Sequence, residues 1–338
     1  MLLSLTYISL PREMVRLRAK AKAHAMQGLV KYHGLKDWKL RIPYHDSISA
    51  NLNSLYTISE VEFGDFESDT LIINGNQVKG RALARVLAVI NKVRSLAEVD
   101  YKVKIVSKNS LPFGKVKGAG FSSSAGAAIT ASSFKALGLD KRFGWDLKLI
   151  SRIARLMAGS ACRSVVGKYA RWYAGDSDNN SYAISFADTK NLDMVMIVVP
   201  LYYNISTEFI HKDVEKSPFF QARIKIAQER CNEVEKAIKN GDFEKVGELV
   251  EQDTMELHAI TMTGEKRAIV LKPESLNVMR LVKRIREKDK IPAYYSMQTG
   301  PTVFINTLSE YKDEVEKELE KRRLKFISCR LGDEVKII

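Results

Sequence analysis

The segment that most constrains this chain is a glycine- and serine-rich loop that runs directly into a helix-forming stretch. Residues 118–128 read Gly-Ala-Gly-Phe-Ser-Ser-Ser-Ala-Gly-Ala-Ala, and small residues continue to position 137, which favours a closely packed helix. The free N–H groups of a first helical turn, the helix dipole and the serine hydroxyls would point to one place, and proteins build anion sites in this way. A serine-rich helix cap that binds nothing is the alternative.

The loop differs from the common nucleotide-binding motifs. It lacks the Gly-Lys-Ser/Thr ending of a Walker A loop and the GxGxxG spacing of a dinucleotide fold. Lys115 and Lys117, just before it, place positive charge at the same mouth, which favours phosphate as the anion. We therefore predict a phosphate-binding loop that includes Gly120, Ser123 and Ser124.

The overall charge also favours an anionic partner. The 338 residues include 54 Lys and Arg against 40 Asp and Glu, a formal net charge of +14. Such a surplus suits nucleic acid, an acidic membrane or a phosphorylated metabolite. Basic residues are mixed with glutamates, as in residues 314–323, which is typical of a solvated surface. We therefore expect a small phosphorylated substrate, no nucleic acid and no membrane; a nucleic-acid-binding protein is the alternative from a different class.

The positions of the cysteines indicate whether disulfides or a metal site are expected, and the length of the apolar runs indicates whether the chain could cross a membrane. The three cysteines are scattered, at positions 162, 231 and 329, so neither a disulfide framework nor a metal site is expected. The longest apolar run, residues 194–201, is too short to cross a bilayer. The amino-terminal stretch lacks the basic start of a signal peptide. We therefore expect a cytoplasmic protein.

Hydrophobic periodicity predicts a mixture of helices and strands. Strands are expected where polar and apolar residues alternate or β-branched residues run together, and helices where apolar residues recur at three- and four-residue spacing. The predicted strands cover residues 102–106, 194–199, 294–305 in two pieces around Gly300 and Pro301, and 324–329. The predicted helices cover residues 125–137, 147–157, 219–258 with a break near Gly241, 276–288 and 309–323.

Four segments, in order along the chain, resemble the GHMP kinase superfamily and, within it, the mevalonate diphosphate decarboxylase group. The glycine–serine loop resembles the superfamily's Gly-Leu-Gly/Ala-Ser-Ser-Ala/Gly. The other three resemble Ile-Lys-Tyr-Trp-Gly-Lys-Arg-Asp, Leu-x-Leu-Pro-x-Asn-x-Ser-Ile-Ser and Gly-Ser-Ala-Cys-Arg-Ser, at residues 30–37, 40–49 and 159–164. The resemblance implies a two-domain α+β fold of the GHMP kinase type. Its N-terminal domain, like domain 2 of ribosomal protein S5, would cover residues 1–190, and a ferredoxin-like domain would cover residues 191–338.

The resemblance also implies roles for individual residues. Arg163 matches the arginine that grips the substrate carboxylate, which a guanidinium does through two parallel hydrogen bonds. Ser160 matches the substrate-binding serine beside it, and Lys31 matches a lysine that can place positive charge next to a departing phosphate. The further binding residues that it implies are Tyr32, Ser206, Thr207 and, where the family has a proline, His24.

Gln298 departs from the family pattern. The family's Tyr-Asp-Ala-Gly-Pro carries an aspartate base that helps to phosphorylate the substrate's 3-hydroxyl, whereas this chain has Met-Gln-Thr-Gly-Pro at residues 297–301. An amide cannot take up that proton. A substrate that already carries a 3-phosphate needs only a clamp for the leaving phosphate and an oriented carboxylate. We therefore predict an archaeal-type decarboxylase that converts mevalonate 3,5-bisphosphate to isopentenyl phosphate, CO2 and phosphate without ATP.

Two related activities remain as alternatives at this point. A mevalonate 3-kinase also lacks the aspartate, and an ATP-dependent decarboxylase of mevalonate 5-phosphate or 5-diphosphate would share the substrate skeleton and the fold. No metal and no cofactor are expected for the bisphosphate decarboxylase, whereas either alternative would use ATP and magnesium. A homodimer is the expected assembly.

Overall fold

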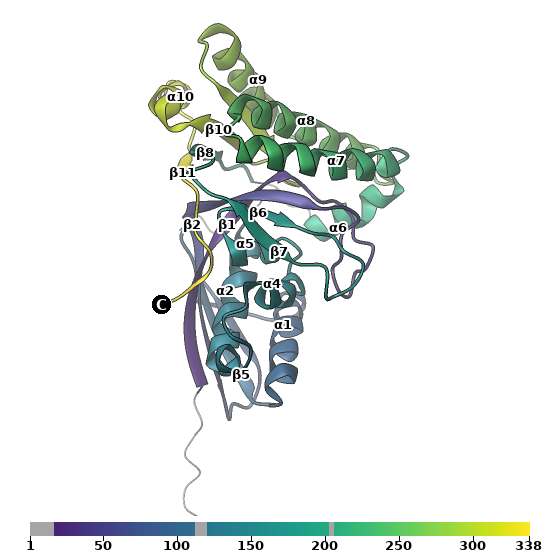
Figure 1. Ribbon diagram of the computed structural model, residues 1–338, viewed down its shortest axis with the longest axis vertical. Helices are drawn as coiled ribbons and strands as arrows, with labels where there is room; N and C mark the ends of the chain where they lie inside the picture. The colour runs from purple at the N-terminus through teal and green to yellow at the C-terminus, as the bar shows by residue number, and fades with distance from the viewer. Residues whose placement is uncertain (1–16, 112–119, 203–205) are drawn as a thin grey trace, which may run out of the picture.

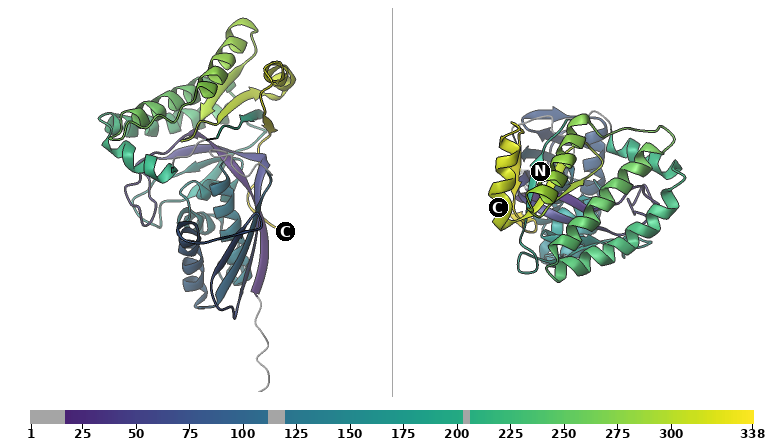
Figure 2. Two further views of the ribbon diagram at one scale, coloured as in Figure 1. Left: turned by 180° about the vertical axis from the view of Figure 1, so that it is seen from behind. Right: turned by 90° about the horizontal axis from the view of Figure 1, so that it is seen from above.

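The computed structural model describes residues 17–111, 120–202 and 206–338, which form two β-sheets with helices packed on them (Figure 1). The first sheet has eight strands and the second has four. The second sheet and its helices lie beyond one end of the long first sheet, as the views in Figure 2 show. The architecture is the α+β class that the sequence predicts.

Two long strands run through the first sheet. β1 (Leu17–Val30) and β2 (Ser47–Gly64) pair antiparallel over most of their length. Alternate residues of β1 are small, and Ala21, Ala23 and Ala25 are fully buried, so a helix can lie close to this face. The other strands of the sheet are β3 (Thr70–Ile73), β4 (Asn76–Val78), β5 (Lys102–Asn109), β6 (Tyr169–Trp172), β7 (Ala183–Ala187) and β12 (Lys336–Ile337).

One helix of the layer that packs on this sheet is buried on almost every side. This helix, α2 (Phe121–Ala136), lies against β1, β2 and α5. Gly126 is needed where α2 meets α5, because a Cβ there would lie 2.7 Å from the Cβ of Ala161. The close approach sets the first turns of the two helices side by side. The other helices that precede β6 are α1 (Arg81–Ala97), α3 (Leu139–Phe143), α4 (Leu147–Arg155) and α5 (Ala161–Val166).

The second sheet is antiparallel, with the strand order β11–β8–β10–β9. Its strand β8 (Met194–Val199) is buried on both faces. The remaining strands are β9 (Ala293–Met297), β10 (Val303–Leu308) and β11 (Ile327–Cys329). The helices of this half are α6 (Thr207–Asp213), α7 (Phe220–Lys239), α8 (Phe243–Met262), α9 (Pro273–Lys288) and α10 (Lys312–Glu320), with short 3-10 helices at Val214–Lys216 and Ser309–Tyr311.

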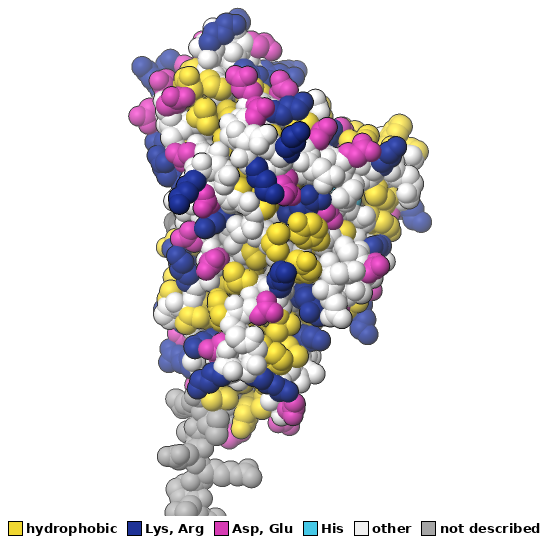
Figure 3. Space-filling model, in the orientation of Figure 1, with side chains coloured by type: hydrophobic (Ala, Val, Ile, Leu, Met, Phe, Trp, Pro, Cys, Tyr) yellow, Lys and Arg dark blue, Asp and Glu magenta, His cyan; other side chains and the backbone are white. Residues whose placement is uncertain are grey.

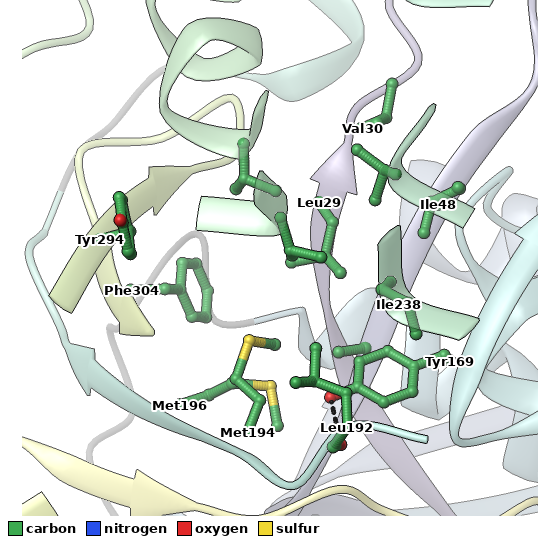
Figure 4. Close-up of a cluster of buried hydrophobic side chains, with 14 of the residues drawn as sticks. Leu29, Val30, Ile48, Tyr169, Leu192, Met194, Met196, Ile238, Tyr294 and Phe304 are labelled. Atoms are coloured by element: carbon green, nitrogen blue, oxygen red, sulfur yellow. Dashed lines mark hydrogen bonds between the residues drawn. The ribbon is translucent and has the colours of Figure 1, made fainter. Parts of the chain in front are cut away.

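A shared hydrophobic cluster joins the two sheets. Figure 4 shows Leu29 and Ile48 of the first sheet, Met196 and Phe304 of the second, and Ile238 of α7 in this cluster. The opposite face of the second sheet packs in a separate cluster with α9 and α10. Helices α7 and α8 also contribute to the shared cluster and therefore fix the position of the second sheet relative to the first. The candidate site described below includes residues from both halves.

The predicted elements after residue 100 are confirmed to within a few residues. β8 has the predicted bounds, and the long helical segment divides into α7 and α8 at Gly241, whose φ of 72° lies in the left-handed region. β9 and β10 are the two predicted strand pieces, whereas β11 is shorter than predicted. β1 and β2 were not predicted. The domain boundary near residue 190 stays a prediction. The C-terminal strand β12 pairs with β1 of the first sheet.

The surface carries both signs of charge. On the face in Figure 3, Lys and Arg side chains are interspersed with Asp and Glu. This differs from the continuous basic stripe that a nucleic-acid-binding face requires. In the part of the chain that the structure describes, no helix has the length and apolar character needed to cross a membrane.

Candidate active site

A cavity of about 540 Å³ opens where the ends of several elements meet. The end of β1 and the loop after it, the first turns of α1, α2 and α6, the turn before α5 and the loop between β9 and β10 all contribute to its wall. The predicted site residues that line it are Lys31, Tyr32, Gly120, Ser123, Ser160, Ser206, Thr207 and Gln298. Residues from distant parts of the chain are thus brought to one cavity.

The start of α2 forms one wall of the cavity. Gly120 has a φ of 79°, and a Cβ there would lie 2.7 Å from the carbonyl oxygen of Met26, so only glycine lets the loop pass this close to β1. The Ser123 hydroxyl donates to the Gly120 carbonyl at 2.5 Å. Ser122 and Ser123 line the cavity at the amino-terminal end of α2, where the helix dipole favours an anion such as phosphate.

The two serines that line the cavity are Ser122 and Ser123, whereas the predicted pair is Ser123 and Ser124. Ser124 is fully buried and does not line the cavity. Its hydroxyl is bonded to that of Thr57 on β2 at 2.7 Å, because a helix turns each successive side chain by about 100°. Ser122, which the sequence analysis did not select, faces the cavity in its place. The predicted Lys115 and Lys117 lie outside the described residues.

Replacing Ser123 with alanine is expected to weaken binding of a phosphorylated ligand by about 10- to 100-fold. The hydroxyl can turn from the Gly120 carbonyl to a charged phosphate oxygen, and such a hydrogen bond contributes roughly 1.5–3 kcal/mol. Isothermal titration calorimetry with a phosphorylated ligand would measure the change. Ser132→Ala is the matched control, since Ser132 lies in the same helix and its hydroxyl donates only to the carbonyls of Ala128 and Ile129. Equal losses in both variants would contradict the prediction.

Arg163 lies beneath the cavity rather than on its wall. It is fully buried in α5, and its Nη1 donates to the carbonyl of Ile48 at 3.3 Å. Its Nε and Nη2 have no hydrogen-bond partner among the described residues. Burial lowers the pKa of the guanidinium. A buried guanidinium with unused donors is costly unless a ligand supplies an anion.

Tyr32 and Lys31 line the cavity close to Arg163. The Lys31 Nζ lies 3.9 Å from the centre of the Tyr32 ring and donates to the Tyr32 carbonyl at 3.2 Å. The Arg163 guanidinium lies 5.8 Å from the same ring. Burial and the nearby charge of Arg163 hold the pKa of Lys31 well below its usual range, although Asp253 opposes this shift.

The backbone of Lys31 is held by two residues of the C-terminal half. Its N–H donates to the Asp253 carboxylate of α8 at 3.0 Å, and its carbonyl accepts from Arg223 of α7 at 3.2 Å. Arg223 also donates to Asp253 at 2.5 Å. Both side chains are almost completely buried. The position of Lys31 in the cavity therefore depends on helices α7 and α8.

Gln298 connects the loop after β9 to the first sheet. Its side-chain NH2 donates to the carbonyl of Met26 on β1 at 3.0 Å, and the residue lines the cavity. The only carboxylate among the described residues that line the cavity is Glu208, which pairs with Arg81 at 2.5 Å. The described wall therefore offers no unpaired carboxylate that could serve as a base.

His24 is a predicted binding residue that the structure does not bring to the cavity. It lies on β1 with its ring against Tyr56, 6.3 Å between ring centres, and a Cβ on Gly332 would contact it at 2.9 Å. Its role in binding stays a prediction: β1 is long, and His24 lies beside the C-terminal segment, away from the strand end that reaches the cavity.

Several cavity residues with polar or charged side chains were not predicted. They include Arg81, Arg85 and His211, which lie outside the motifs, and Arg41, which lies in the segment 40–49. The His211 ring stacks on Tyr32 with 4.9 Å between ring centres, and its Nδ1 accepts from the Gly34 N–H at 3.1 Å. Burial and the charges of Lys31 and Arg41 hold the pKa of His211 well below its usual range. The neutral ring therefore carries its proton on Nε2.

Comparison with known proteins gives matches over nearly the whole chain. The family model described as diphosphomevalonate decarboxylase-like N-terminal domain matches residues 23–183, and the mevalonate 5-diphosphate decarboxylase C-terminal domain matches residues 203–326. The phosphomevalonate decarboxylase of Haloferax volcanii is 37% identical over 89% of this chain and 91% of that protein.

Solved structures agree with this fold. The mevalonate diphosphate decarboxylase of Staphylococcus aureus superposes with a TM-score of 0.89 at 31% identity, over 96% of this chain and 98% of that one. The structure of MDDEF in complex with MVAPP, AMPPCP and magnesium gives a TM-score of 0.89 at 28% identity, over 96% and 99% of the two chains. The expectation that no cofactor is required was therefore wrong, because a relative of the same fold binds an ATP analogue and magnesium.

Proposed function

Because the chain belongs to the diphosphomevalonate decarboxylase family, we propose that it decarboxylates mevalonate 3,5-bisphosphate to isopentenyl phosphate. The membership itself makes it a carboxy-lyase of the mevalonate pathway that acts on a phosphorylated mevalonate. The proposal concerns which phosphorylated mevalonate loses its carboxylate in this cavity.

The observation that carries the proposal is the amide of Gln298 in the cavity wall. Phosphorylation of a 3-hydroxyl needs a base, and the one carboxylate among the described cavity residues is paired with Arg81. An amide has no proton-accepting role at any ordinary pH. The site is therefore better suited to a substrate whose 3-oxygen already carries a phosphate.

The bond changes place distinct demands on the two ends of the site. The C3–O bond breaks and its electron pair leaves with the phosphate. The C1–C2 electron pair then forms the new double bond, and the carboxylate departs as CO2. Negative charge develops on the leaving phosphate, so donors aimed at that phosphate lower the barrier. Ser123 and Lys31 would supply such donors beside the positive end of the α2 dipole.

Arg163 would orient the carboxylate. It lies one turn beyond Ser160, which lines the cavity, so the carboxylate would reach it past Ser160 and Tyr32. The Nε and Nη2 donors, which lack partners among the described residues, match the two oxygens of a carboxylate. Holding the carboxylate in this orientation keeps the C1–C2 bond aligned with the developing charge at C3.

ATP and magnesium also suit the residues present. The first turn of α2, with Ser122 and Ser123, and the three arginines of the wall could hold the phosphates. No group of three or more His, Cys, Asp or Glu among the described residues could hold a metal alone, so magnesium would rely on phosphate oxygens and hydroxyls. When bound, ATP–magnesium would supply a phosphoryl group to a substrate whose 3-oxygen lacks one.

A second candidate is decarboxylation of mevalonate 5-phosphate. It is favoured by the 37% identity to the phosphomevalonate decarboxylase of Haloferax volcanii, which extends over 91% of that protein. This activity would require a different group to take the proton from the 3-hydroxyl.

Steady-state assays on each substrate separately test the proposal. The protein is incubated in separate reactions with mevalonate 5-phosphate, its 5-diphosphate or the 3,5-bisphosphate. ATP–magnesium is supplied in every reaction, and CO2 and the phosphorylated product are quantified. We expect the largest kcat/KM for the 3,5-bisphosphate, with isopentenyl phosphate as the product. An equal or larger kcat/KM for mevalonate 5-phosphate would replace the proposal with the second candidate.

Gln298→Asp is expected to lower kcat/KM for the 3,5-bisphosphate by about 100-fold or more. Two like charges ~4 Å apart at an effective dielectric near 20 oppose each other by about 4 kcal/mol, and the new carboxylate would face the 3-phosphate. Gln298→Asn is the matched control, because it keeps a neutral amide and shortens the side chain equally. If both variants lose the same activity, the loss of the bond to Met26 rather than the charge is responsible.

A further inference from the structure

Thr299 brings a buried hydroxyl without a partner to the cavity wall. The residue lies in the loop between β9 and β10 and lines the cavity, yet it is only 7% exposed. Among the described residues that line the cavity, only Thr299 and His211 have a buried side-chain polar atom without a hydrogen-bond partner. The His211 ring is held by Gly34 and Tyr32, whereas the Thr299 hydroxyl bonds to none of the described residues. Such a hydroxyl is unfavourable unless a ligand supplies its partner.

Hydrogen bonds on both sides of Thr299 fix the loop that carries it. Before it, the side-chain NH2 of Gln298 donates to the carbonyl of Met26 on β1 at 3.0 Å. After it, the carbonyl of Pro301 accepts from the hydroxyl of Ser275 on α9 at 2.8 Å. The strands on either side of the loop pair antiparallel. The position of Thr299 is therefore set before a ligand binds, which reduces the ordering cost of binding.

The carbonyl of Met26 also relates Thr299 to the start of α2. Gly120 passes so close to β1 that a Cβ on it would lie 2.7 Å from this carbonyl oxygen, and Gln298 binds the same oxygen from the second sheet. Next to these two residues, Ser123 and Thr299 line the cavity. An anion at the amino-terminal end of α2, where the helix dipole favours it, would therefore be flanked by Ser123 on one element and Thr299 on the other.

The hydroxyl of Thr299 suits a phosphate better than a proton to be removed. This chain has Thr299 where the family's pattern has alanine, directly after the aspartate that Gln298 replaces. The two changes put an amide and a hydroxyl, both of which can donate, in place of a carboxylate that only accepts and a methyl group. A hydrogen bond to a charged phosphate oxygen is stronger than one to a neutral group.

We infer that Thr299 is a specificity-determining residue whose hydroxyl binds the 3-phosphate of the substrate. The inference rests on the proposed function, since it requires a ligand with a phosphate on its 3-oxygen. As the C3–O bond breaks, negative charge grows on this phosphate, so the hydrogen bond from Thr299 strengthens and assists its departure. Thr299 thus contributes to the choice of substrate as well as to the rate.

Two ligands that differ only in the 3-phosphate test the inference. They are the 5-phosphate and the 3,5-bisphosphate of 3-methylpentane-1,3,5-triol, which have an alcohol in place of the carboxylate and cannot lose CO2. Their dissociation constants are measured by isothermal titration calorimetry with the wild type, Thr299→Val and Thr299→Ser. Valine nearly keeps the shape of threonine but lacks the hydroxyl, whereas serine keeps the hydroxyl.

Thr299→Val is expected to weaken binding of the bisphosphate by about 10- to 100-fold and binding of the 5-phosphate by less than about 2-fold. Thr299→Ser should bind both ligands within about 3-fold of the wild type, because the donor is retained. Equal losses for the two ligands in Thr299→Val, or wild-type affinity for the bisphosphate, would overturn the inference.

Thr307→Val is the matched control. Thr307 is a fully buried threonine of β10 that does not line the cavity, and its hydroxyl donates to the carbonyl of Pro292 at 2.8 Å. Its replacement should lower the melting temperature and leave both affinities unchanged. Thr299→Val should not lower the melting temperature, because its hydroxyl has no partner in the described structure. A lower melting temperature of Thr299→Val would reveal a structural role and count against the inference.

The binding readout is independent of turnover. If Thr299→Val selectively loses the bisphosphate analogue while mevalonate 5-phosphate is the preferred substrate, the proposed function fails and the role of Thr299 stands. If the 3,5-bisphosphate is the preferred substrate and Thr299→Val binds both analogues like the wild type, the role of Thr299 fails and the proposed function stands.

Discussion

Replacing Arg163 with alanine is expected to lower kcat/KM by about 30- to 1000-fold while the protein stays folded. A charge-assisted pair of hydrogen bonds to a carboxylate is worth roughly 2–4 kcal/mol in the transition state. Within the described structure Arg163 makes one hydrogen bond, to the carbonyl of Ile48, and its Nε and Nη2 have no partner. Removing it therefore relieves an uncompensated buried charge in the ligand-free protein.

Thermal unfolding and steady-state kinetics on the same preparations would check this. The melting temperature of Arg163→Ala should be near that of the wild type, which distinguishes a lost substrate contact from a lost fold. Arg163→Lys serves as the control for charge alone, since an ammonium cannot form two parallel hydrogen bonds with a carboxylate, and it should recover only part of the activity. Wild-type kcat/KM in a folded Arg163→Ala would remove this residue from the mechanism.

Between pH 7 and pH 5.5 the free energy of unfolding is expected to fall by about 3–5 kcal/mol. Four of the five histidines are buried: His33, His45, His211 and His258. Burial is the largest cause of the lowered pKa of each, to about 3 for His45 and about 4 for His258, and well below the usual range for the other two.

The sign follows from proton linkage. In the unfolded chain these histidines bind protons as the pH drops below about 6.5, whereas in the folded protein they stay neutral. The unfolded state therefore gains protons that the folded state does not, and stability is lost as the pH falls. Each histidine contributes about 1.2 kcal/mol over this interval. Burial raises the pKa of Asp253. Proton uptake by Asp253 in the folded protein therefore offsets part of the loss of stability that the histidines cause.

Urea unfolding at a series of pH values would measure this dependence. His258→Leu is the informative variant, because both ring nitrogens of His258 are buried and lack hydrogen-bond partners in the described structure. The variant should lose about a quarter less stability on acidification than the wild type. A variant curve parallel to the wild-type curve, or a wild-type stability that is flat between pH 7 and 5.5, would show that this explanation is incorrect.

The sequence predicts best where one local signal decides the structure. β8 is a continuous apolar run between an aspartate and a proline, and its bounds are the predicted ones. α2 was predicted from its small residues and begins four residues earlier, at Phe121. β1 was missed because its buried positions are alanines, which do not stand out as apolar in a period-two pattern and have low strand propensity.

The candidate site was predicted only where its residues belong to short motifs. Lys31, Ser160 and Gln298 line the cavity, and each was selected from its neighbours in sequence. Arg85 carries no such signal, because the packing of α1 against the end of α4 brings it to the cavity. Ser124 and His24 were selected from motif position alone, which does not state on which side of an element a side chain lies.

The contacts around Lys31 restrict how this protein can be recombined with its relatives. Asp253 and Arg223, from the C-terminal half, bind the N–H and the carbonyl of a residue in the N-terminal half. A chimera that joins two relatives between β7 and β8 would exchange both side chains at once and leave Lys31 as it was. Such a hybrid would keep its lysine in place only if the incoming half presents a matching acid and base at these two positions, so the halves must be inherited or engineered as a pair.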